Sequence, residues 1–572
     1  MAGIIRQPRR GRASRVKLSA VDILTTHAVE NQPPPFEDVN LFSSDAALSE
    51  GVARAGAEWA RERLVRFGAR VGSAEFLALG RQANRFPPEL RSHDRFGHRI
   101  DEVEFHPAWH EVMREAMAHE VHNLPWRDPR AGAHVARSAL HSLLSQVESG
   151  SCCPLTMTFA CRPTLQLQPE IAAEWEPGLQ GTRYDPRLVP AAHKSSVLIG
   201  MAMTEKQGGS DVRANTTRAR PTGAGGPGAE YELIGHKWFC SAPMSDAFLT
   251  LAQTGRGLSC FLVPRVLADG TRNPFRLQRL KDKLGNRSNA SSEIEYAGTR
   301  ARLVGEEGRG VRTILQMVHH TRLDCVSGST GLMRQALAQA LHHASHREAF
   351  GKRLADQPLM QNVLADLALE VEGATALMLR LAQAFDRAPE DAGERAFARI
   401  ATAVGKYWVC KRAPAMIYEA MECLGGAGYV EESILPRLYR EAPLNAIWEG
   451  SGNVMCLDVL RAIVREPDSL PALLDELRAA RGADPRYDAA VADIERELAR
   501  PDDAERRARR LVEALATALQ AKLLLRDAPA AVADAFVAGR IAEPGHAFGT
   551  LPVGVDFASI LARARPGRAS GA

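Results

Sequence analysis

Several kinds of sequence pattern are missing from this chain of 572 residues. It has no run of about 18 apolar residues, so no membrane-spanning helix is expected. Its nine cysteines include no C-x-x-C pair and are odd in number, which argues against a zinc ribbon and against a disulfide framework. The first twenty residues carry six basic groups but lack the apolar core of a secretory signal. These features predict a protein of the reducing cytoplasm that has no membrane association.

Familiar signatures of nucleotide binding and hydrolysis are missing too. The chain contains no G-x-x-x-x-G-K-[ST], no H-E-x-x-H and no G-x-S-x-G, and no glycine triplet follows a strand in the Rossmann arrangement. Any nucleotide cofactor must therefore be held by another fold. Charge is also balanced, with 72 Lys plus Arg against 68 Asp plus Glu, so the net charge does not indicate a nucleic-acid partner.

The length predicts several packed units, because single cores seldom grow beyond about 250–300 residues. Short β-rich runs such as YELIGHKWF and LSCFLVPR lie between two regions of helical spacing. We expect an α+β protein: a disordered basic tail (1–24), an N-terminal helical domain (25–200), a central β domain (201–305), a C-terminal helical bundle (306–464) and an added helical module (465–572).

Two motifs in the β domain are weak when each is taken alone. MAMTEKQGGSDV lies where helix gives way to strand, and its backbone N–H groups and hydroxyls suit a phosphate or a flavin edge. An ordinary Gly-Gly turn is the better explanation when the motif is taken alone, because such turns are common. GHKWFCSAP places Trp238 on a strand, where an indole can wall a planar ring but more often belongs to the core.

A third motif is more unusual, because Glu449 stands between Trp448 and Gly450 in an apolar turn, IWEGSGN. Apolar surroundings raise the pKa of a carboxyl group and suit it to act as a general base. The alternative is an acid that caps a helix N-terminus.

The order of the motifs decides between these readings. T-E-x-x-G-S-D, K-W-F, R-x-x-F-G, L-G-G-x-G-Y, R-L-Y-R-E and W-E-G-[ST] follow one another along the chain. This series resembles the acyl-CoA dehydrogenase family. The longer segments MTEKQGGSDV, KDKLGNRSNAS and IWEGSGNVMCLDVLR look like its AidB adaptive-response branch.

The resemblance implies an acyl-CoA dehydrogenase-like fold with a central β-barrel-like domain, bound FAD and a homotetramer. Arg347 and Phe350 match residues that reach the FAD of a neighbouring subunit. The implied FAD contacts within the chain are Met201, Ala202, Met203, Thr204, Gly208, Gly209, Ser210, Trp238, Phe239, Cys240, Ser241, Ile447, Trp448, Gly450, Ser451, Gly452, Asn453 and Leu457.

The resemblance also implies a reaction, in which Glu449 removes the α-proton of an acyl thioester while the β-hydride passes to flavin N5. Some relatives carry the base on the helix where this chain has Thr321, so Glu449 has no competitor there. Trp448 stands where tyrosine is usual and narrows the acyl pocket, which predicts a small or unusual thioester. An oxygen-using oxidase remains an open alternative.

AidB-type proteins are associated with the DNA alkylation response and with duplex DNA bound through the C-terminal module. Residues 466–572 hold 15 Lys plus Arg against 17 Asp plus Glu, so only a local ridge is a candidate. That ridge consists of Arg506, Arg509, Arg510, Lys522 and Arg526. A solvated, ion-paired helix face is the alternative. A DNA-binding protective flavoprotein with little thioester turnover is therefore the second hypothesis.

The histidines are the remaining candidates for metal ligands. His342 and His346 form an i, i+4 pair, but no acidic or cysteine third ligand is placed nearby. Solvated or core histidines are the better interpretation, and no metal site is predicted.

Overall fold

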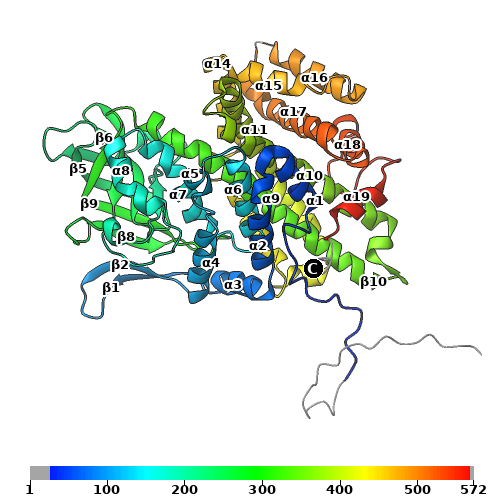
Figure 1. Ribbon diagram of the computed structural model, residues 1–572, viewed down its shortest axis with the longest axis horizontal. Helices are drawn as coiled ribbons and strands as arrows, with labels where there is room; N and C mark the ends of the chain where they lie inside the picture. The colour runs from blue at the N-terminus through cyan, green and yellow to red at the C-terminus, as the bar shows by residue number, and fades with distance from the viewer. Residues whose placement is uncertain (1–25, 501, 567–572) are drawn as a thin grey trace, which may run out of the picture.

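The computed structural model describes residues 26–500 and 502–566, so the predicted basic tail lies outside the described residues. The N-terminal third is mainly helical, and in Figure 1 it lies between the β domain on the left and the C-terminal helices at the top and right. Its helices are α1 (Ala46–Val52), α2 (Arg61–Val71), α3 (Ala74–Arg85), α4 (Pro107–Ala118), α5 (Leu124–Arg127), α6 (Ala133–Ser145), α7 (Cys152–Leu165) and α8 (Pro169–Leu179).

A hairpin of β1 (Glu89–His93) and β2 (Arg99–Glu104) interrupts these helices and was not expected from the sequence. It projects from the body of the molecule (Figure 1). Its turn is closed by Asp94, whose side chain accepts hydrogen bonds from the N–H groups of Phe96 and His98. Because the two strands are short and polar, they carry almost none of the apolar alternation that reveals a strand.

Seven strands form the β domain. They are β3 (Ile199–Ala202), β4 (Arg218–Pro221), β5 (Glu230–Ser241), β6 (Ala247–Thr254), β7 (Gly257–Pro264), β8 (Phe275–Leu280) and β9 (Ser291–Val304). The sheet order is β3-β6-β4-β5-β9-β7, and β6 also pairs with β7, so the sheet closes on itself like a barrel. Tyr231, Phe248, Phe261, Phe275 and Tyr296 fill its centre. The predicted β-barrel-like fold is confirmed.

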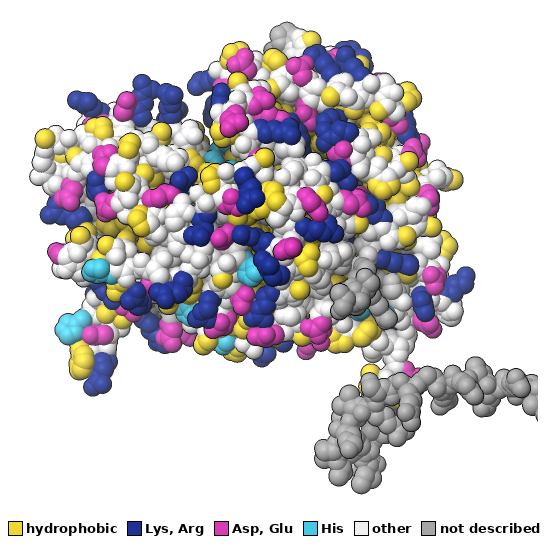
Figure 2. Space-filling model, in the orientation of Figure 1, with side chains coloured by type: hydrophobic (Ala, Val, Ile, Leu, Met, Phe, Trp, Pro, Cys, Tyr) yellow, Lys and Arg dark blue, Asp and Glu magenta, His cyan; other side chains and the backbone are white. Residues whose placement is uncertain are grey.

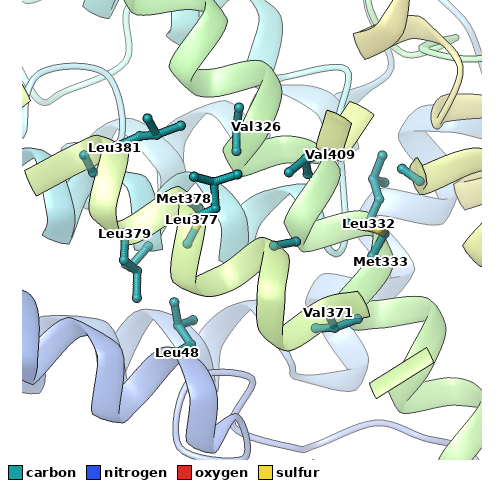
Figure 3. Close-up of a cluster of buried hydrophobic side chains, with 14 of the residues drawn as sticks. Leu48, Val326, Leu332, Met333, Val371, Leu377, Met378, Leu379, Leu381 and Val409 are labelled. Atoms are coloured by element: carbon teal, nitrogen blue, oxygen red, sulfur yellow. The ribbon is translucent and has the colours of Figure 1, made fainter. Parts of the chain in front are cut away.

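Long helices form the second bundle: α9 (Gly310–His346), α10 (Pro358–Arg387), α11 (Ala392–Glu422), α13 (Leu435–Glu441) and α14 (Gly452–Arg465), with the short α12 (Gly426–Tyr429). The helical periodicity around residues 311–347 and 359–388 correctly predicted α9 and α10. Val326, Leu332, Met333, Leu377 and Val409 interlock where the three longest helices meet (Figure 3).

The final segment consists of α15 (Ser469–Arg478), α16 (Pro485–Leu498), α17 (Ala504–Asp527), α18 (Ala530–Val537) and α19 (Phe557–Ala564). It packs directly on the bundle (Figure 1). Leu515 and Leu519 of α17 belong to the same buried cluster as Leu377 of α10 and Leu64 of α2. None of the helices over the described residues is both long and apolar enough to cross a bilayer.

Candidate active site

Glu449 lies in the loop between a short 3-10 turn (Leu444–Ala446) and α14, and its backbone has a φ of 57°. Ser451, not Glu449, is the N-cap of α14, so the capping alternative is wrong. The loop is held through its main chain. Arg322 Nε donates to Glu449 O at 3.1 Å, and Lys406 Nζ donates to Trp448 O at 2.7 Å and to Gly450 O. These hydrogen bonds offset the strain of the left-handed backbone conformation at Glu449.

The carboxylate of Glu449 accepts a hydrogen bond from Thr321 Oγ1 on α9 at 2.7 Å. Burial raises the pKa of Glu449, while the Thr321 hydrogen bond and the charges of Arg322 and Lys406 pull it down. Position 321, where some relatives carry the base, and position 449 are therefore in direct contact in this chain. Here threonine is the hydrogen-bond donor to the glutamate.

Asp458 on α14 completes this support. Its carboxylate pairs with Arg322 at 2.8 Å and with Arg399 of α11 at 3.0 Å. Sequence reasoning missed Arg322, Lys406 and Asp458 as supporting residues. The signal available was Lys406 within the apolar helical run AVGKYWVC, since a lone lysine there must find partners if it is buried.

Trp448 borders the apolar side of the site. Its indole packs against a buried cluster that includes Met157 of α7 and Ile199 of β3, and Met201 and Met203 pack against the same cluster. Trp448 Nε1 donates to Asn445 Oδ1 at 2.9 Å, which fixes the ring. The structure thus brings the first predicted flavin motif and the Glu449 loop onto one apolar surface.

The segment from Met201 to Ser210 is anchored by a buried ion pair. Glu205 and Lys237 Nζ lie 2.8 Å apart with both side chains fully buried, and Glu205 also accepts from the N–H groups of Thr216 and Thr217. Gly208 has a φ of 136°, and a Cβ on Gly209 would collide with Thr204 Oγ1. This tight turn brings backbone and the Thr204 hydroxyl to the surface, which fits the edge of a flavin.

The four residues from Trp238 to Ser241 on β5 point in different directions. Trp238 is half-buried with Lys281 Nζ 3.1 Å from its ring centroid, and Phe239 is exposed. Cys240 is fully buried in the centre of the β domain, as is Ala202 of β3. Because strand alternation turns the side chains of Ala202 and Cys240 inward, only their main chain is available to a flavin, and the expected contacts of these two residues stay a prediction.

The loop after Glu449 offers a face to a cofactor. Ile447, Ser451, Asn453 and Leu457 are exposed, whereas Gly452 is buried beside Lys411 and Tyr407. Two exposed aliphatic side chains next to an exposed amide suit a partly apolar, partly polar ring system. Together with the Thr204 turn, these residues fit a flavin.

Arg347 and Phe350 lie elsewhere, on the hairpin of β10 (Glu348–Ala349) and β11 (Lys352–Arg353), at the end of the molecule away from the β domain (Figure 1). Phe350 is 99% exposed with a φ of 55°, and Arg347 donates to Asn31 O. Within one chain they do not join the site.

The predicted basic ridge on α17 is shorter than expected. Lys522 is only 3% exposed and pairs with Glu476, and Arg526 pairs with Asp527. Lys522 was wrong as a DNA contact, because helical spacing alone does not reveal that α15 covers that position. Arg506, Arg509 and Arg510 are exposed, although Arg509 Nε donates to Asn453 Oδ1 at 2.8 Å. Basic and acidic side chains are interspersed over the face in Figure 2.

His342 and His346, the i, i+4 pair for which no metal site is predicted, lie near the end of α9. His342 Nε2 contacts Pro34 O, and the rings of His342 and His346 lie 4.5 Å apart. Across residues 26–500 and 502–566, no group of three or more His, Cys, Asp or Glu side chains is arranged to hold a metal ion.

A helical domain, a closed β domain and a helical bundle around a half-buried glutamate define the acyl-CoA dehydrogenase class. Residues 200–299 match the middle domain of acyl-CoA dehydrogenases, residues 308–464 their C-terminal domain, and residues 31–186 the N-terminal domain of the adaptive response protein AidB. The chain therefore belongs to the acyl-CoA dehydrogenase family and resembles its AidB members most specifically.

Individual relatives agree. The chain is 52% identical over 478 residues to the putative acyl-CoA dehydrogenase AidB of Escherichia coli, covering 83% of this chain and 87% of that protein. Caenorhabditis elegans ACDH-11, solved in complex with C11-CoA, superposes with a TM-score of 0.80 at 26% identity, over 96% of this chain and 95% of that one.

A Bacillus anthracis acyl-CoA dehydrogenase complexed with FAD shares the fold, with a TM-score of 0.60 at 17% identity over 75% and 77% of the two chains. Homologues in the acyl-CoA dehydrogenase family bind FAD.

Proposed function

We propose that this protein is an FAD-dependent oxidoreductase that oxidises the Cα–Cβ bond of an acyl-CoA thioester, with Glu449 as the catalytic base. The observation that carries the proposal is the half-buried Glu449 side chain, whose carboxylate is hydrogen-bonded by Thr321 beside an apolar surface shared with the Met201 to Ser210 segment. The C. elegans relative in complex with C11-CoA supports a thioester ligand.

In this reaction Glu449 removes the α-proton, and its raised pKa brings the base closer to the acidity of a bound thioester. Thr321 orients the carboxylate, while Arg322 and Lys406 keep the loop in place. The turn around Thr204 and the face of Ile447, Gly450 and Leu457 would hold the FAD. When bound, FAD supplies the acceptor for the β-hydride.

Anaerobic addition of short-chain acyl-CoA esters to the FAD-loaded protein tests the proposal. The flavin absorbance should bleach in the wild type and should not bleach in Glu449→Gln, which keeps the size of the side chain but cannot accept the proton. Glu390→Gln, at an exposed acid between α10 and α11, is the matched control and should bleach normally. Bleaching that survives in Glu449→Gln would rule out the assigned base.

The proposal includes a homotetramer in which neighbouring subunits share the FAD site. A phenylalanine that is 99% exposed on a protruding hairpin is explained if Arg347 and Phe350 reach the FAD of a neighbouring subunit in a homotetramer. Sedimentation velocity gives the oligomeric state. Phe350→Ala should weaken FAD binding without moving the Glu449 loop.

A second candidate function is duplex DNA binding by a protective flavoprotein with little thioester turnover. The observation that favours it is the exposure of Arg506, Arg509 and Arg510 on the first half of α17. Binding to duplex DNA should weaken as salt rises, and Arg506→Gln with Arg510→Gln should reduce the salt slope by about two. Affinity that is independent of salt would reject the ridge.

A further inference from the structure

Helix α6 carries an unusual set of buried polar side chains that the proposed function has not used. His134, Arg137, Ser138 and His141 are 8%, 0%, 0% and 3% exposed. Within the described part of the chain, His134 Nε2, Arg137 Nη2, Ser138 Oγ and His141 Nδ1 have no hydrogen-bond partner. Each such atom costs about 1–3 kcal/mol when it is left unpaired. Four of them on one helix are hydrogen-bonding groups that a polar group of a ligand would satisfy.

This polar cluster lies next to the site of Glu449. Arg137 forms an ion pair with Asp324 of α9, and Thr156 Oγ1 of α7 donates to Asp324 Oδ2 at 2.6 Å. Asp324 follows Thr321 by three residues, so the two side chains lie on one face of α9, roughly 5–6 Å apart at Cβ. Since Thr321 bonds Glu449, the polar cluster begins one helical turn beyond the carboxylate.

The charges around Arg137 cancel, whereas His134 at the start of the cluster lies 3.0 Å from the carboxylate of Asp386. Arg137 and Asp324 neutralise one another, and burial lowers the pKa of His141 to about 4, so this ring is neutral near pH 7. The guanidinium lies 3.8 Å from the ring centroid of Phe159, which fixes its plane. What remains are unpaired donors, Arg137 Nη2–H and the Ser138 hydroxyl, without excess positive charge.

The arrangement distinguishes between classes of acyl group. A plain alkyl chain would leave the donors unpaired, at about 1–3 kcal/mol for each donor. A carboxylate would bring a further negative charge to a cluster in which Arg137 is already paired with Asp324. A hydroxyl or keto oxygen satisfies the donors at no charge cost.

We propose that Arg137 and Ser138 bind a neutral oxygen, a hydroxyl or a keto group, on the acyl chain of the thioester, about one helical turn from Glu449. The inference rests on the proposed function, since it assigns the substrate class of the same site. One turn of about 5.4 Å corresponds to about four carbon–carbon bonds, so an oxygen on the sixth carbon reaches the cluster.

Calorimetric titration tests this with three probes, hexanoyl-CoA, 6-hydroxyhexanoyl-CoA and adipyl-CoA. The FAD-loaded Glu449→Gln protein is used so that no turnover occurs. We expect 6-hydroxyhexanoyl-CoA to bind about tenfold more tightly than hexanoyl-CoA, the gain from one or two buried hydrogen bonds, and more tightly than adipyl-CoA.

Two variants locate the effect. Ser138→Ala should reduce the preference for the hydroxyl several-fold, and the double variant Arg137→Met with Asp324→Leu, which removes both charges together, should reverse it in favour of hexanoyl-CoA. Ser145→Ala is the matched control on α6, because that hydroxyl already donates to His141 O at 2.8 Å. Its preference should equal that of the parent protein.

Three results would overturn the inference. Equal or tighter binding of hexanoyl-CoA, unchanged in Ser138→Ala, would mean that water satisfies these atoms. Tightest binding of adipyl-CoA would replace the neutral oxygen by an anion. If none of the three esters binds, the proposed function itself fails, which the other two results do not imply.

Discussion

At the scale of single residues, the site depends on a glutamate in an unfavourable backbone conformation that is held from outside. The carbonyls of three consecutive residues, Trp448, Glu449 and Gly450, are bound by Lys406 and Arg322. A glutamate with positive φ costs of order 1–3 kcal/mol, and these charged donors offset that cost. The side chain is therefore positioned before any ligand arrives.

The Thr321 hydrogen bond stabilises the ionised form of Glu449, so its removal should raise the pKa of the carboxyl group further. The base is active when deprotonated, so the rate of flavin reduction rises with pH through this pKa. In Thr321→Val that acid limb should move upward by about one pH unit. Stopped-flow reduction across pH 5–9 measures it.

Thr330→Val is the control on the same helix, since the Thr330 hydroxyl donates to Val326 O at 2.9 Å. Its acid limb should coincide with that of the wild type. An unshifted limb in Thr321→Val would mean that a group other than Glu449 titrates.

At the scale of elements, the turn from Met201 to Ser210 depends on the buried pair of Glu205 and Lys237. Lys237→Met leaves a buried carboxylate without a counter-charge, which should lower the free energy of unfolding by about 3–5 kcal/mol and weaken FAD binding. Urea unfolding and flavin titration measure the two effects. The double variant with Glu205→Gln should recover much of the stability.

Lys206→Met, at an exposed lysine in the same turn, serves as the matched control and should change neither quantity. Weak FAD binding in this control would mean that surface charge, not the buried pair, maintains the turn.

Elements with strong apolar periodicity could be predicted from the sequence, as α9 and α10 show. The hairpin β1–β2 could not, since its strands are short and polar, and their pairing depends on the turn at Asp94. The order of the motifs predicted Glu449 as the base. It did not predict the left-handed backbone of Glu449 or the hydrogen bonds that Arg322 and Lys406 donate to this loop, because both donors lie on helices more than forty residues away in the sequence. The prediction of a basic ridge was wrong at Lys522, because that side chain is buried against Glu476 of α15.

At the scale of the whole molecule, the C-terminal helices are not a detachable module. They contribute to the buried cluster that also contains α2, α9, α10 and α11. The carboxylate of Glu476 on α15 forms ion pairs with two helices at once. Its partners are Arg380 of α10 and Lys522 of α17. A continuous core predicts that these parts unfold together.

Scanning calorimetry should therefore show a single endotherm for each subunit. Lys522→Met, which leaves Glu476 with one partner fewer in a buried position, should lower the temperature of that transition without splitting it. Arg506→Met, an exposed position on the same helix, should leave it in place. Two resolved transitions in the wild type would contradict a shared core.

The bond between Arg509 of α17 and Asn453 connects the outer surface to the first turn of α14, the helix that follows the Glu449 loop. An anion that recruits the guanidinium of Arg509 must compete with that bond. By thermodynamic reciprocity, whatever engages Asn453 from the flavin side then alters the affinity of α17 for anions by the same factor. One hydrogen bond between α14 and α17 thus couples anion binding at α17 to cofactor binding beside Asn453, so a change in one affinity can be measured through the other.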